Sequence, residues 1–306
     1  MNQAPVKLSI IIPHHKGEAL LYKCIQSLYN TSYSNYEIIV VDNNSKDQSI
    51  LKSKKEFPEI KVLSLDQNLG YAGGCNKGAL EAQGELLLFL NNDTIHENNW
   101  IEPLVDMMDN YKDIGSIQPK IKNINNKDRF DYAGGSGGFL DIFCFPFTRG
   151  RIFNSIEVDL NQYDNQLEVF WASGCAFVTR KKIFNQITFD STLFAYMEEI
   201  DYAWKLHLLG YKNYVEPKSV IYHDGGELSS NNYFKSYYNH RNSLILFLTN
   251  HNLIFMGILL LPKILLEIIS LVRYLFLLNF SGIIAQLSSL MWILSHPIYI
   301  INRIIK

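Results

Sequence analysis

The chain has 306 residues, of which 47% are hydrophobic and 19% are charged, and its formal net charge at pH 7 is −2. This length is enough for one large domain with an appendage, or for two domains with a sizeable core. The weak net charge provides no basic field of the kind that nucleic-acid binding requires, so nucleic acid is excluded as a partner.

The N-terminal apolar stretch from Leu8 to Ile12 is too short for the core of a signal peptide and is expected to form a strand. We therefore expect that this part of the protein is not exported. The four cysteines have no CxxC spacing, which predicts neither a zinc site nor a disulfide framework and favours a reducing cytosol.

Residues 1–121 alternate strand-length apolar runs with stretches of helical length. The apolar runs are 8–12, 36–42, 61–65 and 86–90, and the helical stretches are 18–30, a lysine-rich stretch after residue 42, 72–83 and 99–111. This alternation predicts an α/β fold whose mostly parallel sheet has helices on both faces. In such sheets ligands bind beyond the carboxyl ends of the strands, and polar clusters follow all four runs here.

Residues 122–166 lose this periodicity, so they are expected to form a binding loop or to be disordered. A strand-like stretch at 168–180 then leads into "FAYMEEIDYAWKLHLLGYK", in which Glu198 and Asp201 share a helical face with Tyr202. We expect one domain over 1–230 whose pattern changes at about residue 121.

The region 231–306 has a different, apolar character. Formal charges are absent between Asn242 and Pro262 and again between Tyr274 and Asn302. The stretch 274–302 is long enough for a bilayer span, although polar residues dilute it. An interfacial helical hairpin and an all-helical soluble subdomain remain as alternatives.

The glycine-rich stretch "NLGYAGGCNKG" at 68–78 lies between a predicted strand and a predicted helix. Backbone N–H groups in such a place can hold a phosphate. The spacing matches neither GxGxxG nor the P-loop. The alternative is a tight turn that needs small residues for close helix packing.

Two aspartates follow predicted strands. Asp42 can accept a hydrogen bond from a pyrimidine ring N–H, or it can cap the next turn. Asp93 can bind a divalent cation, Mg²⁺ or Mn²⁺, together with substrate phosphates, with Asn91 and Asn92 as uncharged neighbours. Its alternative role is that of a structural turn residue.

Three further side chains are candidates for chemistry. Glu198 and Glu199 begin a predicted helix, where the macrodipole favours acidic residues whether or not one of them is a general base. His223, in "VIYHDGG", can complete a metal shell or lie in a surface loop.

The order of these motifs resembles that of the inverting glycosyltransferases of family 2, which have the GT-A fold. The rhamnosyltransferase-like branch of bacterial surface-polysaccharide synthesis is the most similar. The resemblance covers roughly residues 8–247. It is carried by "SIIIPHHKG", "CIQSLYNTSYSNYEIIVVDNNSKDQS", "NLGYAGGCNKG", "GELLLFLNNDT", "WASGCAFVTRK", "FAYMEEIDYAWKLHLLGYK", "VIYHDGG" and "YYNHRNSLILF".

The resemblance implies a catalytic domain over 1–230, with a donor half at about 1–121 and an acceptor half at about 122–230, and it implies roles for individual residues. Donor binding falls on Pro13, Asp42, Asn68, Gly73, Gly74, Asn76, Asn91, Asn92 and Asp93. Asp93 matches the position that meets the cation, and His223 matches a histidine that can approach the metal or the diphosphate. The catalytic base falls on Glu199, although the branch usually has Asp there, which leaves Glu198 as an alternative. Lys16 replaces the usual asparagine of the first motif.

The implied reaction is a single displacement at the cytoplasmic face of the cell membrane. It moves a sugar from a nucleotide-sugar donor, dTDP-rhamnose or a UDP-sugar, to a hydroxyl of a lipid-linked glycan or polysaccharide acceptor. The C-terminal region would then bind the membrane surface, with Lys263, Arg273, Arg303 and Lys306 meeting anionic lipid head groups. A non-catalytic member that binds nucleotide sugar or scaffolds an assembly is the alternative. A nucleotidyltransferase would need a glycine-rich loop after the first strand, where "PHHKG" stands.

Overall fold

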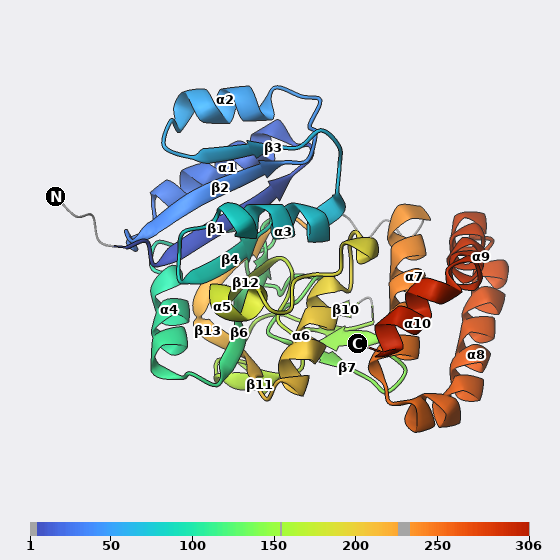
Figure 1. Ribbon diagram of the computed structural model, residues 1–306. Coiled ribbons are helices and arrows are strands. Elements are labelled where there is room, and N and C mark those ends of the chain that lie inside the picture. The colour runs from blue at the N-terminus through green and yellow to red at the C-terminus, as the bar shows by residue number, and fades with distance from the viewer. Residues whose placement is uncertain (1–4, 154, 226–232, 306) are drawn as a thin grey trace. The chain divides into compact units, whose positions relative to one another are not determined.

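The computed structural model describes residues 5–153, 155–225 and 233–305, and its chain divides into two compact units (Figure 1). The α/β unit comprises the described residues up to Phe139, together with Phe147–Phe194 and Glu198–Gly225. The helical unit comprises Leu140–Pro146, Ala195–Met197 and the described residues from Tyr233 onward. Each unit is described on its own below.

The central sheet of the α/β unit begins with four parallel strands. These are β1 (Leu8–His14), β2 (Tyr36–Asp42), β3 (Lys61–Ser64) and β4 (Leu86–Leu90). β1 lies between β2 and β4, and β3 follows β2 at the edge. All four predicted strands are therefore present, because each apolar run is long enough to be buried on both faces of a sheet.

The sheet continues with strands from the second half of the chain. β12 (Ala176–Arg180) runs antiparallel between β4 and β6 (Ile114–Asn123), and β13 (Lys212–His223) runs parallel to β6. β11 (Leu167–Val169) and β5 (Thr94–His96) pair antiparallel with β13. The region 122–166 also holds the short strands β7 (Gly138–Leu140), β8 (Pro146–Thr148), β9 (Arg151–Ile152) and β10 (Ser155–Ile156).

Helices cover both faces of this sheet. One face carries α1 (Glu18–Tyr29), α2 (Ser49–Glu56) and α4 (Ile101–Asn110), and the other carries α3 (Gly70–Glu81), α5 (Lys181–Phe184) and α6 (Glu198–Leu208). Successive side chains of a strand point to opposite faces, so Ile10 and Ile12 enter one core cluster and Ile11 enters the other. The predicted α/β class with helices on both faces is confirmed.

The helical unit contains α7 (Tyr233–Asn250), α8 (Leu253–Phe276), α9 (Phe280–Ser295) and α10 (Pro297–Ile305), drawn in orange and red in Figure 1. By length and composition α8 can cross a membrane, whereas α9 and α10 pass the same test only as a pair bent by 72°. The stretch 274–302, for which the sequence left a span, an interfacial hairpin and a soluble subdomain open, is divided among the end of α8, α9 and α10. The Asn279 side chain caps α9 by accepting from Gly282 N at 2.9 Å, and a new helix starts at Pro297.

The polar side chains of α8 lie inside the helical unit. Lys263 is only 1% exposed, donates to Phe143 O at 3.0 Å and lies 3.2 Å from Glu267 Oε1. Glu267 Oε2 in turn accepts from Gln286 Nε2 at 2.7 Å and lies 3.2 Å from His240 Nδ1. The expectation that Lys263 meets lipid head groups is therefore wrong, because a buried charge needs partners within the protein.

The other predicted head-group contacts have different surroundings. Arg273 is exposed. Arg303 donates to Thr249 Oγ1 and to Asn250 Oδ1, both at 3.2 Å. Lys306 lies outside the described residues.

Candidate active site

The carboxyl ends of β1 and β2 bring His14 and Asp42 side by side in register. Asp42 Oδ1 accepts from Ser45 N at 2.8 Å, so this carboxylate caps the turn that follows β2. The capping role that the sequence left open is therefore present. A pyrimidine contact by Asp42 remains a prediction.

Asn92 connects the loop after β4 to the loop after β1. Its amide nitrogen donates to His14 Nδ1 at 2.8 Å and to Lys16 O at 3.2 Å. With Nδ1 as an acceptor, the His14 proton is assigned to Nε2, which lies 2.7 Å from Ser49 Oγ. Burial lowers the pKa of His14, which is consistent with a neutral ring in this chain of hydrogen bonds.

Asp93 and His223 meet because β5 pairs with the last residues of β13. Asp224 N donates to Asp93 O at 2.9 Å, and Asp93 Oδ1 lies 3.2 Å from His223 Nε2. The imidazole bonds through Nδ1 to Asp131 Oδ1 at 2.9 Å. His223 therefore lies between two carboxylates, and its Nε2 faces Asp93.

Charge and burial act in opposite directions on His223. Burial favours the neutral ring, but the Cys175 sulfur and the two carboxylates outweigh it and raise the pKa of the imidazole well above its usual range. These neighbours therefore favour the charged form of the ring. A cation on Nε2 would have to replace a proton there.

The pair of Asp93 and His223 fits a divalent cation in two respects. Asp93 Oδ1 is buried, and among the described residues it faces the His223 Nε2 at ion-pair distance. Two ligand atoms at about 2.1 Å from one cation lie roughly 3 Å apart, close to the 3.2 Å found here. Over the described parts of the chain, no group of three or more His, Cys, Asp or Glu side chains could hold a metal. The remaining ligands would have to come from substrate and water.

Glu198 and Glu199 begin α6 but have different surroundings. Glu198 is 4% exposed, and its Oε2 has no hydrogen-bond partner among the described residues. Burial, followed by the charge of Glu199, raises the pKa of the Glu198 carboxyl well above its usual range. Glu199 is partly exposed. The two carboxyl groups are thus not equivalent, and burial favours the neutral form of Glu198.

Gly174 and Cys175 lie just before β12. Gly174 is beside Glu199, and Cys175 is beside His223. The Glu199 side chain lies beside Gly174, where an added Cβ would be in ordinary contact with it, 3.5 Å from Glu199 Cδ. Burial raises the pKa of the Cys175 thiol to about 11, while its hydrogen bond to His223 acts in the opposite direction. The Tyr71 hydroxyl donates to Gly174 O. Glu199 and His223 therefore flank one dipeptide.

The predicted donor residues of the glycine-rich stretch fall in two places. Gly74 packs against Asn43 and Pro13, where an added Cβ would lie 2.6 Å from Asn43 Nδ2 and 3.2 Å from Pro13 Cβ. Gly73 and Asn76 instead line a surface hollow. Its lining residues are Gln67, Asn68, Leu69, Gly73, Asn76, Lys77, Leu80, Ser191 and Phe194.

Several of these side chains also have bonds within the protein. Asn68 Oδ1 accepts from Gly70 N at 2.8 Å, and Asn76 binds the backbone of Phe189 through both ends of its amide. Asn91 Nδ2 lies 3.4 Å from His223 Nε2. Close packing of small residues, the structural alternative for this stretch, is therefore present. Donor contacts by these residues stay a prediction.

Two residues of this site were not identified from the sequence. Tyr71 lies within the glycine-rich stretch, where only asparagines and glycines attract attention as phosphate neighbours. Asp131 lies in the loop 122–166, which lacks periodicity. The only available signal for it is an acidic residue just before the glycine-rich "AGGSGG".

The geometry places the α/β unit among proteins that bind ligands beyond the carboxyl ends of their parallel strands. Residues 9–188 match the family described as glycosyl transferase family 2, and the chain belongs to this family. The predicted membership of family 2 is therefore confirmed, whereas the inverting mechanism and the rhamnosyltransferase-like branch stay predictions.

Among curated proteins, the chain is similar to glycosyltransferase GlyA of Streptococcus pneumoniae serotype 4, with 27% identity over 189 residues, which are 60% of this chain and 26% of GlyA. It is 32% identical over 147 residues to the O-antigen biosynthesis protein RfbC of Myxococcus xanthus, covering 47% of this chain and 11% of RfbC. The chain thus spans well under two thirds of the length of these relatives.

Two solved structures share the fold. GalNAc-T7 with UDP, GalNAc and Mn²⁺ has a TM-score of 0.64 at 18% identity, over 81% of this chain and 48% of that one. S. aureus TarS 1–349 in complex with UDP has a TM-score of 0.51 at 19% identity, over 78% and 65% of the two chains. The predicted GT-A type of α/β fold is confirmed by this similarity together with the family match.

Proposed function

We propose that this chain is an inverting glycosyltransferase that moves a sugar from a nucleotide-diphosphate donor to an acceptor hydroxyl. The observation that carries this proposal is the arrangement around Gly174 and Cys175. Glu199 lies against one of these residues, and the His223 to Asp93 pair adjoins the other. A single displacement requires a base for the acceptor hydroxyl and a separate group that binds the leaving diphosphate. Glu199 and the pair of His223 and Asp93 are candidates for these two roles, and they contact the adjacent residues Gly174 and Cys175.

Glu199 is the proposed general base. Burial raises the pKa of the Glu198 carboxyl and so favours its protonated form, which is a poor proton acceptor, whereas the Glu199 side chain is partly exposed. The acceptor hydroxyl gives its proton to a Glu199 oxygen while its own oxygen forms the bond to the anomeric carbon. The bond from that carbon to the diphosphate oxygen breaks at the same time, on the opposite face, and inversion results.

Asp93 and His223 are the proposed holders of a divalent cation, Mn²⁺ or Mg²⁺. The buried Asp93 Oδ1 and the neighbouring His223 Nε2 support this assignment. When bound, the cation supplies positive charge for the diphosphate as it leaves. Asp131 orients the ring through Nδ1, an arrangement that commonly fixes metal-binding histidines.

The donor that we propose is dTDP-rhamnose or a UDP-sugar. The similar structures of GalNAc-T7 and TarS were solved with UDP, and RfbC is named for O-antigen biosynthesis. The acceptor that we propose is a lipid-linked or polymeric surface glycan. The name of RfbC and the apolar helical unit support this choice.

The enzymatic proposal is tested by measuring transfer from a panel of nucleotide sugars with Mn²⁺ or Mg²⁺. We expect one donor class to react in the presence of cation, and Asp93→Asn to abolish the response to cation. Asp224→Asn, which removes the neighbouring carboxylate, is the matched control and should leave this response intact. Metal-dependent transfer by Asp93→Asn would contradict the site. Donor binding without turnover would favour the non-catalytic alternative.

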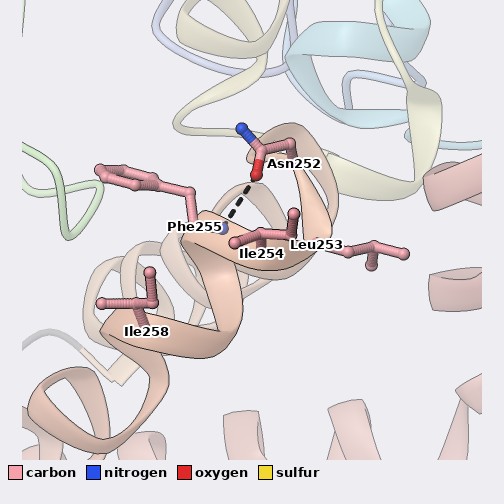
Figure 2. A pocket seen from close by; sticks show the side chains of 5 residues that line it. All are labelled: Asn252, Leu253, Ile254, Phe255 and Ile258. Carbon is pink, nitrogen blue, oxygen red and sulfur yellow. Dashed lines mark hydrogen bonds between the residues drawn. The ribbon is translucent and has the colours of Figure 1, made fainter.

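We also propose that the helical unit binds the cytoplasmic face of the cell membrane. Large apolar side chains of α8 point outward, with Leu261 75% and Phe276 85% exposed, while Lys263 and Glu267 are paired inside. Figure 2 shows the start of α8, where Asn252 caps the helix and apolar side chains line an open hollow. Polar groups inside and apolar groups outside are the arrangement that lipid contact favours.

Binding to vesicles that contain anionic lipid tests this second proposal. Leu261→Asp combined with Phe276→Asp should reduce partitioning by roughly tenfold for each apolar side chain removed. Leu80→Asp on α3 changes an equally exposed leucine, 71% exposed, in the α/β unit and should have no effect. Equal binding by all variants would refute a role of α8.

A further inference from the structure

The four residues that precede α6 have an unusual backbone. Phe194, Tyr196 and Met197 have φ values of 65°, 66° and 73°. Positive φ values are unfavourable for residues other than glycine, and three such residues out of four are rarely found without external support. The next residue is Glu198, the first of α6, followed by Glu199.

Asn242 on α7 holds this segment. Its amide nitrogen donates to Ala195 O at 3.0 Å and to Tyr196 O at 2.6 Å, and its side chain is fully buried. These two bonds use both N–H donors of the amide. Arg241 Nε donates to Asn242 Oδ1 at 2.9 Å, so the amide can point only one way.

The chain connects this contact directly to the proposed base. Ala195–Met197 belong to the helical unit, whereas Phe194 on one side and Glu198 on the other belong to the α/β unit. Met197 is two residues before Glu199. A change of backbone conformation at 195–197 would therefore change where α6 begins and where the Glu199 carboxylate lies.

We propose that Asn242 is a positioning residue for Glu199: by binding the carbonyls of Ala195 and Tyr196, it holds the segment 195–197, with its positive φ values at Tyr196 and Met197, in the conformation from which α6 starts. This inference rests on the proposed role of Glu199 as base. It assigns a function to the "HRN" of α7, which neither donor binding nor membrane binding requires.

The test uses Asn242→Asp in the full chain, because aspartate has nearly the same shape but no N–H donors. Ser243→Ala is the matched control. Ser243 is the next residue of α7, is also buried, and donates to a backbone carbonyl, Cys144 O at 2.9 Å, away from 195–197. Arg241→Lys is a milder variant, which keeps the charge but removes the Nε donor that orients the Asn242 amide.

We expect Asn242→Asp to lower kcat by on the order of 100-fold with the KM for donor nearly unchanged, because a displaced base affects the chemical step more than donor binding. Arg241→Lys should lower kcat by roughly tenfold in the same way. Hydrogen exchange of the amides in 195–199 should become faster in both variants. Ser243→Ala should keep kcat and the exchange of 195–199, even where it lowers Tm.

The proposal is overturned if folded Asn242→Asp keeps its kcat, or if Ser243→Ala loses as much kcat at a similar Tm. If Asn242→Asp does not fold, an Arg241→Lys enzyme with unchanged kcat and unchanged exchange overturns it. Failure of the proposed function is recognised separately. Glu199→Gln would then retain transfer, while exchange at 195–199 would still report on the Asn242 contact.

Discussion

Replacing Glu198 or Glu199 by glutamine should have opposite consequences, although the two residues are adjacent. Glu199→Gln removes the proposed base and should lower kcat by about 10²- to 10⁴-fold, the usual contribution of a general base. Glu198→Gln replaces a buried, protonated carboxyl by an amide of the same shape. Transfer should therefore remain within about fivefold of the wild-type rate, since the chemical step makes no use of a neutral acid there.

The pH dependence of stability provides a second, independent expectation for Glu198. Its folded-state pKa is raised above the ordinary value of 4.5, so above that pH the folded protein keeps a proton that the unfolded chain releases. Stability then falls as pH rises from 4.5 toward the folded-state pKa, by up to about 1.4 kcal/mol per pH unit. Glutamine cannot titrate, so Glu198→Gln should be more stable than the wild type at pH 8, with little difference near pH 4.5.

Both expectations can be measured with the same preparations. Single-turnover transfer separates the chemical step from product release, and thermal unfolding between pH 4.5 and pH 8 reports the stability difference. A Glu198→Gln enzyme that loses more activity than Glu199→Gln would show that the base is Glu198. A stability difference that does not grow with pH would show that Glu198 is charged in the folded protein.

Three further predictions concern single side chains. Asp131→Asn should weaken Mn²⁺ binding in the presence of UDP about 10- to 100-fold, measured by electron paramagnetic resonance, because the partner that orients His223 is changed; unchanged affinity would contradict this role. Burial lowers the pKa of His96 to about 3, so below pH 6.5 the unfolded chain binds more protons than the folded protein. The free energy of unfolding should therefore fall by about 1.4 kcal/mol for each unit by which the pH decreases below 6.5. This fall should be absent in His96→Gln, and an identical slope in that variant would exclude His96 as its source. Gly78→Ala should cost about 1–3 kcal/mol in chemical unfolding, because its Cβ would lie 2.4 Å from Ile11 Cγ2; the exposed Lys77→Ala on the same helix should not, and a stabilised Gly78→Ala would show that the core yields.

The parallel half of the sheet could be read from local pattern. The four apolar runs and their intervening helices appear with boundaries close to those expected, for example Tyr36–Asp42 for the run at 36–42. This succeeds because a strand buried on both faces must be apolar throughout, and because helix and strand place side chains with different periods. The turn after Asp42 follows from the same local chemistry.

The composition of the site was less accessible. Asp93 and His223 could be singled out as polar residues after strands, but their contact depends on the pairing of β5 with β13. Asp131 joins them from a loop without periodicity. Pairings between distant segments depend on how the whole sheet is assembled, so no spacing along the chain reveals them.

The hydropathy of the C-terminal region was evident from its composition, whereas its helix boundaries and the placement of its charges were not. Lys263 reads as a surface cation but lies buried beside Glu267. Glu198 and Glu199 present the same ambiguity at the site, being adjacent and chemically alike while only Glu198 is buried. Local periodicity specifies where an element forms and which side of it is apolar. The environment of one ionisable group depends on neighbours from distant segments, and those neighbours decide whether the group is charged.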